Sequence, residues 1–506
     1  PIYHTVKEAF GLSDVEISEI ESQKGGYDTN VYKTLESIIN DRLYGEGSVA
    51  QVIGKVNLNK AAGTLSAITA HSMLSLNWLG SGLNNALQAE VSNFIMAGNR
   101  TFFTDKNLAK AHVKYTKMWP DVMKNMGSFH SEAKLDQLRH KFLPESLDFN
   151  GLQNNFLKNT KAKRLFGDLG GAQLFSKMGE SVGQGTLVLA MLDNMKVTNQ
   201  DGKYIDKEGK VVSKRKEAAT IEEFYEFDKK DKIWKLPTAL AINNGGTKIN
   251  VEGFDIKNGK DLEFKIRRKI QEAAKRSQGN YGEKNKAMIQ RYAGGKLGLL
   301  MRRWLIPSVQ RRLKGFGYGK EKRNFNEAIG EFDEGSYIAA FHFMKNVVSQ
   351  GGSLKERITS SWNGMTIHER GLTVEAVKEF ALITSAAIAA VGLKALAESA
   401  GSEEEEKFWY TVLYLTKRTQ ADLSIYSYGL PGNFNRTLKD PSVALNTINS
   451  ALGILSPFDI FDEYETGKSK GDNKKWHKLN MLLNPVYKHF YEDFDPKAKY
   501  GYIDKF

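Results

Sequence analysis

The chain has 506 residues, a formal net charge of +13 and no cysteine. At about 150 residues per domain the length favours roughly three domains. The absence of cysteine excludes disulfide scaffolds, cysteine-based zinc sites, iron–sulfur clusters and thiol nucleophiles. The positive charge favours an acidic partner, such as nucleic acid or an anionic membrane surface.

The N-terminal region, residues 1–195, is predicted to be helical. It begins at Pro1 without a signal-peptide pattern, so we expect either a trimmed initiator Met or a piece of a longer chain. Residues Ala61–Ala89 carry no formal charge but are diluted by Ser, Gly and Asn. This composition favours a buried helical hairpin that turns at Gly80–Gly82. The alternative is a segment that meets membrane.

A helical seam is predicted between residues 108 and 126. Its members recur at spacings of four and three residues, which places them on one face of a helix. They are Leu108, His112, Tyr115, Trp119, Val122 and Met126. We expect Pro120 to be a possible break in this helix, and we expect His112 to be a packing residue rather than a metal ligand.

A small β-rich insertion is predicted at residues 196–256. Two turn sequences, Asp201-Gly202-Lys203 and Glu208-Gly209-Lys210, precede short alternating segments. Residues 232–236 and 248–251 alternate in the manner of strands. The insertion therefore interrupts an otherwise helical protein.

The basic helical segment, residues 257–330, carries the strongest functional signal. Between Lys265 and Arg323 there are 18 Lys and Arg residues against three Glu, so the rest of the chain is close to neutral. Leu262, Ile266, Ile270 and Ala273 recur at helical spacing and predict a buried face. The arginine pairs are expected off that face. The alternative to a binding surface is a solvated helix face that balances acidic neighbours.

We predict that this segment binds a polyanion, because guanidinium groups suit phosphate oxygens. Interleaved aromatic residues could stack on exposed bases or fill the apolar face of a helix. The predicted polyanion-binding residues are Arg267, Arg268, Lys269, Lys275, Arg276, Arg302, Arg303, Arg311, Arg312 and Lys314. The two pairs 302–303 and 311–312 are the strongest candidates.

The C-terminal helical region is predicted at residues 331–475, followed by an aromatic tail at residues 476–506. A helix is expected from Ile338 to about Gly351. Residues Phe380–Leu393 are 14 uncharged positions, short for a membrane span and typical of a core helix. Residues Pro441–Phe458 are also uncharged but polar-diluted. The tail is predicted to dock on another surface.

Catalytic motifs are missing from the sequence, so we predict a protein that is not an enzyme and needs no cofactor or metal. There is no His-Glu-x-x-His pattern and no complete phosphate-binding glycine loop. Asp459, Asp462 and Glu463 lack the close spacing of a two-metal polymerase site. We interpret them as acids in the first turn of a helix that begins after Pro457.

The basic segment resembles part of the very large virion proteins of crAss-like bacteriophages. The similarity rests on Gly279-Asn280-Tyr281-Gly282, Gly294-Gly295-Lys296 and the run from Leu299 to Pro307, with Arg311-Arg312 beyond it. It extends over the flanking helices, the β-rich insertion and the Asn-rich C-terminal part, about 300 residues in all. Related proteins include a virion RNA polymerase, whose Asp-x-Asp-x-Asp pattern is absent here, so that activity is not implied.

The resemblance implies a cargo protein that is stored in the lumen of the capsid, portal and tail and is ejected into the host with the genome. It implies portal or tail proteins and several copies of the chain as partners, with phage DNA and transient host-membrane contact as further partners to consider. The alternatives are a nucleic-acid-binding accessory protein, associated with a polymerase, and a structural tail protein.

Overall fold

The computed structural model describes residues 52–53, 56–57, 82–125, 132–143, 174–237, 249–254, 259–278, 305–315, 325–326, 331–332, 334–424, 463 and 473. In these residues ten α-helices accompany eight strands of two or three residues, which confirms the mainly α class with a small β-rich element. The predictions for Pro441–Phe458 and the aromatic tail lie outside the described residues, as does most of Ala61–Ala89.

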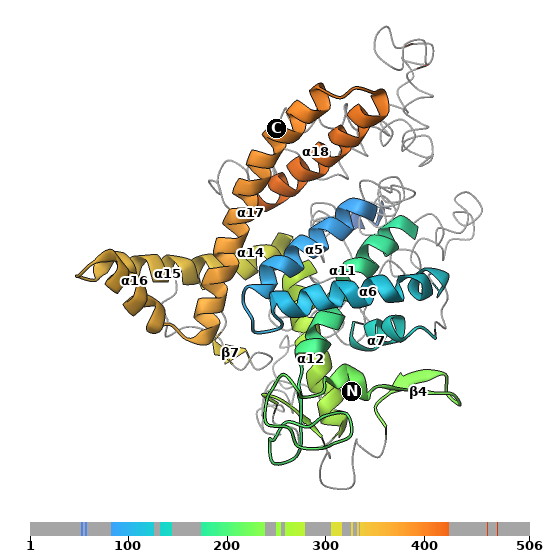
Figure 1. Cartoon of the computed structure of the whole chain (residues 1–506). Coiled ribbons are helices and arrows are strands. Elements are labelled where there is room, and N and C mark those ends of the chain that lie inside the picture. The colour runs from blue at the N-terminus through green and yellow to red at the C-terminus, as the bar shows by residue number, and fades with distance from the viewer. Residues whose placement is uncertain are drawn as a thin grey trace, which may run out of the picture.

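The main helical body consists of α5 (Asn84–Ala97), α6 (Asp105–Asn125), α7 (Lys134–Phe142), α11 (Leu174–Asn194) and α12 (Gly259–Gln278). Helix α11 lies at its centre, and Leu187–Leu192 are completely buried around the whole helix. Gly185 allows α6 to approach, because a Cβ atom there would lie 2.5 Å from the ring of Tyr115. The other four helices cover α11 with their apolar faces (Figure 1).

The β-rich insertion follows α11 directly. Strand β3 (Val197–Thr198) pairs antiparallel with β6 (Asn250–Val251), and β4 (Glu226–Asp228) pairs with β5 (Ile233–Lys235). Between β3 and β4 a 3-10 helix, η5 (Ile221–Phe224), begins with a capping box between Thr220 and Glu223. Gly202 and Gly209 close the two predicted turns with positive φ angles of 76° and 80°.

Two further hairpins of strands lie where helix was predicted. Strand β1 (Val52–Ile53) pairs with β2 (Val56–Asn57), and β7 (Phe325–Asn326) pairs with β8 (Glu331–Phe332). Each strand has only two residues, too short for a period-two pattern to appear in the sequence.

The C-terminal part is built on α14 (Leu305–Leu313), α15 (Ser336–Ser349), α16 (Leu354–Asn363), α17 (Ile367–Glu398) and α18 (Glu403–Ser424). Figure 1 shows α15 and α16 as one helical hairpin beside the main body, and α17 and α18 as a second that projects away from it. Capping boxes at Ser353 and Thr366 begin α16 and α17. Four glutamates, Glu403–Glu406, begin α18 and complement its dipole.

The expected core helix at Phe380–Leu393 is helical but is not buried as predicted. Within this stretch only Ile383 and Ala390 are buried, and Ile388 and Val391 are 70% and 74% exposed. The reason is that α18 covers one face of α17, and the described residues leave the opposite face exposed. Helix α17 is also the one described helix that is long and apolar enough to cross a membrane, by length and composition alone.

Two predictions about α6 are wrong. The helix runs through Pro120 without ending there. His112 is not in the buried seam: its side chain is 47% exposed, and its Nε2 lies 3.2 Å from Glu90 Oε2. The buried face instead runs through Leu108, Ala111, Tyr115 and Val122, because position 111 fits the core-facing direction better than position 112.

Candidate polyanion-binding surface

Helix α12 presents an apolar face to the core and a basic face to solvent. The predicted apolar residues Leu262, Ile266, Ile270 and Ala273 are completely buried. On the other side Arg268 and Lys275 are exposed, while Arg267 and Lys269 are half-buried. The amphipathic pattern read from the sequence is therefore confirmed for this helix.

Two basic side chains of α12 are held mainly by the protein itself. The Nζ atom of Lys269 lies 5.3 Å from the ring centre of Phe254, and burial lowers the pKa of this amine. Arg276 is buried, with its Nε donating to Glu272 Oε1 at 3.3 Å and its Cζ 5.8 Å from the ring centre of Phe102. These contacts stabilise α12 against the body.

The pair Arg311 and Arg312, a leading phosphate-binding candidate, is buried and ion-paired. Arg312 Nε donates to Glu379 Oε1 at 2.8 Å, and a second nitrogen of the same guanidinium contacts the same oxygen. Arg311 Nε lies 3.3 Å from Glu375 Oε1. All four side chains are 3% exposed or less. In this fold neither arginine can reach an external polyanion, and the prediction for these two residues is wrong.

We call these four residues the buried charge junction. It joins α14 to α17, and two buried guanidinium groups require two buried carboxylates because an unpaired buried charge is costly. Asn99, after α5, donates to Glu375 Oε2 at 3.2 Å and extends the junction into the main body. Gly335 permits the close approach before α15, since a Cβ there would lie 2.3 Å from the carbonyl oxygen of Arg312.

The remaining predicted residues give no further cluster. Lys314 follows α14 and is half-buried. Arg302, Arg303 and the interleaved aromatic residues from Tyr281 to Tyr318 lie outside the described part of the chain, as do Asp459 and Asp462. Among the described residues no group of three His, Asp or Glu side chains could hold a metal ion.

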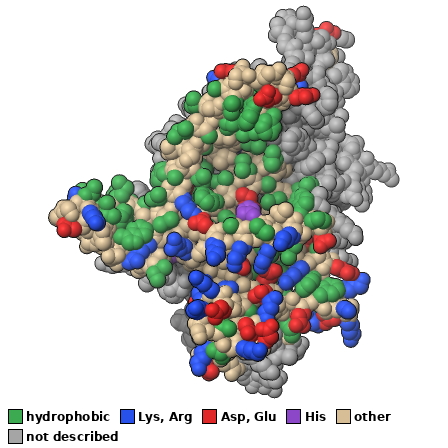
Figure 2. Space-filling view, viewed as in Figure 1, with side chains coloured by type: hydrophobic (Ala, Val, Ile, Leu, Met, Phe, Trp, Pro, Cys, Tyr) green, Lys and Arg blue, Asp and Glu red, His purple; other side chains and the backbone are tan. Residues whose placement is uncertain are grey.

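A row of lysines on α6 is the basic feature that the sequence reading missed. Lys106, Lys110 and Lys117 are exposed, and at 100° per residue they point within about 40° of one another, opposite the buried face of the helix. Figure 2 shows Lys and Arg side chains in a row across the middle of the molecule, over α6. The spacing of these lysines, four and seven residues, could have indicated the row from the sequence. It was overlooked because three lysines stand out little beside the denser basic segment 265–323.

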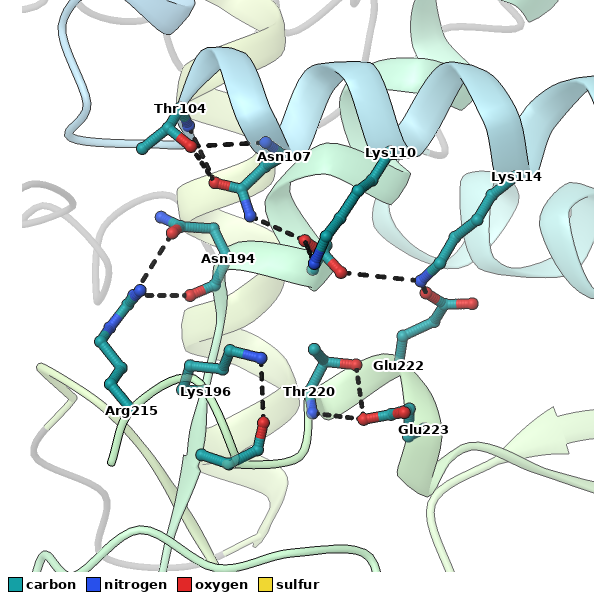
Figure 3. A network of polar contacts seen from close by, with 12 residues as sticks. Thr104, Asn107, Lys110, Lys114, Asn194, Lys196, Arg215, Thr220, Glu222 and Glu223 are labelled. Atoms are coloured by element: carbon teal, nitrogen blue, oxygen red, sulfur yellow. Dashed lines mark hydrogen bonds and ion pairs between the residues drawn. The ribbon is translucent and has the colours of Figure 1, made fainter. Parts of the chain in front are cut away.

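The inner edge of α6 is held by a network of polar contacts with α11 and the insertion (Figure 3). Asp193, nearly buried at the end of α11, accepts from Asn107 Nδ2 at 2.7 Å and from Lys110 Nζ at 3.4 Å. Lys114 Nζ donates to Glu222 Oε2 at 2.6 Å. The network neutralises the charge of Lys114 and part of the charge of Lys110. Lys106 and Lys117 form no ion pair with a described residue.

No protein-family profile, no curated protein and no solved structure matches this chain.

Proposed function

We propose that this chain is a non-enzymatic virion protein of a tailed bacteriophage. It is stored in the lumen of the capsid, portal and tail, in several copies and against other virion proteins, and it enters the host cell with the genome. The resemblance of the basic segment to large phage virion proteins is the reason for proposing a phage particle. The structural support comes from the apolar surface of the C-terminal helices.

That surface is the observation that carries the proposal. Of the 18 large apolar side chains exposed among the described residues, twelve lie on α15, α16, α17 and α18. Figure 2 shows such side chains gathered over the two projecting helical hairpins. A freely diffusing monomer rarely exposes so much clustered apolar surface, whereas a protein packed against others in a particle covers it.

The test is mass spectrometry of purified particles before and after DNA ejection. We expect peptides of α15–α18 in full particles, in more than one copy per particle, and their depletion from particles that have released their DNA. Absence from full particles would contradict storage. Full retention after ejection would contradict delivery and favour a structural tail protein.

A second candidate function is contact with nucleic acid, favoured by the lysine row on α6. Lys106 and Lys117 lie about 16 Å apart along the helix, at 1.5 Å per residue. This length matches about five phosphates of one DNA strand, at 3.4 Å per nucleotide. Arg268 and Lys275 on α12 add two exposed charges from the segment that the sequence indicated.

A further inference from the structure

Residues on the exposed face of α17 recur at the spacing found where two helices pack along their length. We call this row of residues the α17 seam. Its members recur at alternating steps of four and three residues, the repeat by which one helix keeps contact with another along its length. They are Val377, Ala381, Thr384, Ile388, Val391 and Ala395, and all six are exposed. The exposed fractions of Val377, Ile388 and Val391 are 61%, 70% and 74%.

The seam is apolar and points away from α18. Its only polar member is Thr384, whose hydroxyl donates to the carbonyl oxygen of Phe380 at 2.9 Å, so this polar group is already satisfied within the helix. The residues that pack toward α18, including Ala390 and Ala397, lie about 150° away around the helix at 100° per residue. The helical hairpin therefore leaves this face without a partner among the described residues.

The order of large and small residues along the seam identifies the partner. If two copies of α17 are aligned antiparallel about position 386, Val377 faces Ala395 and Ala381 faces Val391 of the other copy. Thr384 then faces Ile388. Every layer combines a larger with a smaller side chain, as even packing requires, whereas a parallel pair would stack like on like.

We propose that a second copy of this chain docks on this seam, with the two α17 helices antiparallel and a two-fold axis at the level of residue 386. Such an interface is isologous, so each copy offers the same surface. The positions that flank the seam fit this arrangement. Lys394 of one copy falls beside Phe380 of the other, and Ala387 meets Ala387, so no like charges are opposed.

A lipid bilayer fits this surface less well, although α17 is long and apolar. Insertion of the helical hairpin would carry the four glutamates Glu403–Glu406 at its tip through the hydrocarbon, and each charge at the bilayer centre costs several kcal/mol. Arg418, which is exposed on α18, would also lie within the hydrocarbon. If the partner is instead the α17 helix of a second copy, neither the four glutamates nor Arg418 has to enter hydrocarbon.

The first experiment is sedimentation equilibrium of the full chain over a range of concentrations. The seam spans about five turns, so we expect a weak dimer with a dissociation constant in roughly the micromolar range. Ile388→Glu should raise the dissociation constant at least tenfold, because it places a charge in the central layer. Ala389→Glu is the matched control: it is exposed on the same helix, off the seam, and should leave the dimer intact.

A monomeric wild-type chain at all concentrations, or equal effects of the two substitutions, would overturn the proposal. Circular dichroism of both variants establishes that the helices remain. If the chain floats with vesicles of neutral phospholipid and forms no dimer, the surface is assigned to lipid instead. These measurements use the purified chain alone, so their failure is distinct from a failure of the proposed storage in virions.

The second experiment tests the orientation by cross-linking. The chain has no native cysteine, so Ala381→Cys and Val391→Cys chains each carry one thiol. An antiparallel pair brings position 381 of one chain to position 391 of the other, and mixed oxidation should give mostly the heterotypic disulfide. Mostly homotypic disulfides would overturn the antiparallel register.

Discussion

Glu379 is a completely buried carboxylate that accepts from one arginine and lies 3.8 Å from Nη2 of another. Its substitution Glu379→Gln leaves Arg312 and Arg311 with one full carboxylate between them. Because an unpaired buried charge is strongly destabilising, we expect a loss of about 3 kcal/mol in the free energy of unfolding. Urea denaturation followed by circular dichroism measures this loss.

The matched control for that change is Glu398→Gln on the same helix. Its side chain is 59% exposed, with Lys394 at 4.0 Å. Exposed pairs of this kind contribute less than about 1 kcal/mol. Equal effects of the two substitutions would show that the buried charge junction does not hold α17 to the body.

His112 gives a pH-dependent prediction at the same scale. The hydrogen bond that the His112 ring donates to the Glu90 carboxylate raises the pKa of the imidazole above its usual 6.5. A raised pKa means that the contribution to stability is complete below about pH 6.5 and is lost as pH rises through the folded-state value. The difference in unfolding free energy between wild type and His112→Gln should therefore shrink from pH 5.5 to pH 8.5.

The expected size is below about 1 kcal/mol, because nearly half of the His112 side chain is exposed and solvent screens the pair. Thermal unfolding at several pH values suffices to measure it. A difference that stays constant, or that grows with pH, would contradict the assigned ion pair with Glu90.

At the scale of single helices, α6 carries the exposed lysine row that we propose as a contact for nucleic acid. Replacing Lys106, Lys110 and Lys117 by Ser should weaken duplex DNA binding and flatten the dependence of log affinity on log salt. Each lost phosphate contact lowers the slope by about 0.9. Fluorescence anisotropy at several salt concentrations measures both quantities.

A control variant with the same loss of charge replaces Lys229, Lys345 and Lys355, which are exposed on other elements. The double variant Arg268→Ser and Lys275→Ser separates a contribution of α12 from that of α6. If the control variant reduces the slope as much as the α6 variant, binding depends on net charge and not on the lysine row.

The helices differ in how far their surroundings could be predicted from sequence. Helix α12 was predictable because Leu262, Ile266 and Ile270 recur at helical spacing, and that periodicity is a local property. The burial of Arg311 and Arg312 could not be predicted from the local sequence, because their partners Glu375 and Glu379 lie more than 60 positions further along the chain. Segment Phe380–Leu393 shows the same limit: its helix is local, but its burial depends on what packs on each face.

For the whole molecule, these packing differences predict an unequal distribution of stability. Helix α11 has six consecutive completely buried residues, Leu187–Leu192, surrounded by helices on several sides. The outer half of α17 is covered by α18 on one face, with only Ile383, Ala390 and Ala397 buried between Phe380 and Glu398. Opening the α17–α18 hairpin therefore exposes less buried apolar surface to water than opening the main body.

We therefore expect amide hydrogens of α17 from Phe380 onward to exchange through local opening, and those of α11 only through global unfolding. In hydrogen exchange on the dilute chain, protection of α17 should be lower than that of α11 by at least tenfold. The inner half of α17 provides an internal reference, because Glu375 and Glu379 tie it to α14. Its amides should exchange more slowly than those of the outer half.

Concentration provides the decisive control on this last prediction. If two chains pair along the α17 seam, raising the protein concentration should slow exchange in the outer half of α17, because opening this segment breaks the dimer. Global unfolding breaks the dimer as well, so the reference is a surface element that opens locally and away from the seam, such as the β4–β5 hairpin, whose exchange should not change. Equal protection of α17 and α11 in the dilute chain would contradict the unequal stability. Equal slowing in the β4–β5 hairpin at high concentration would indicate nonspecific association instead of pairing through α17.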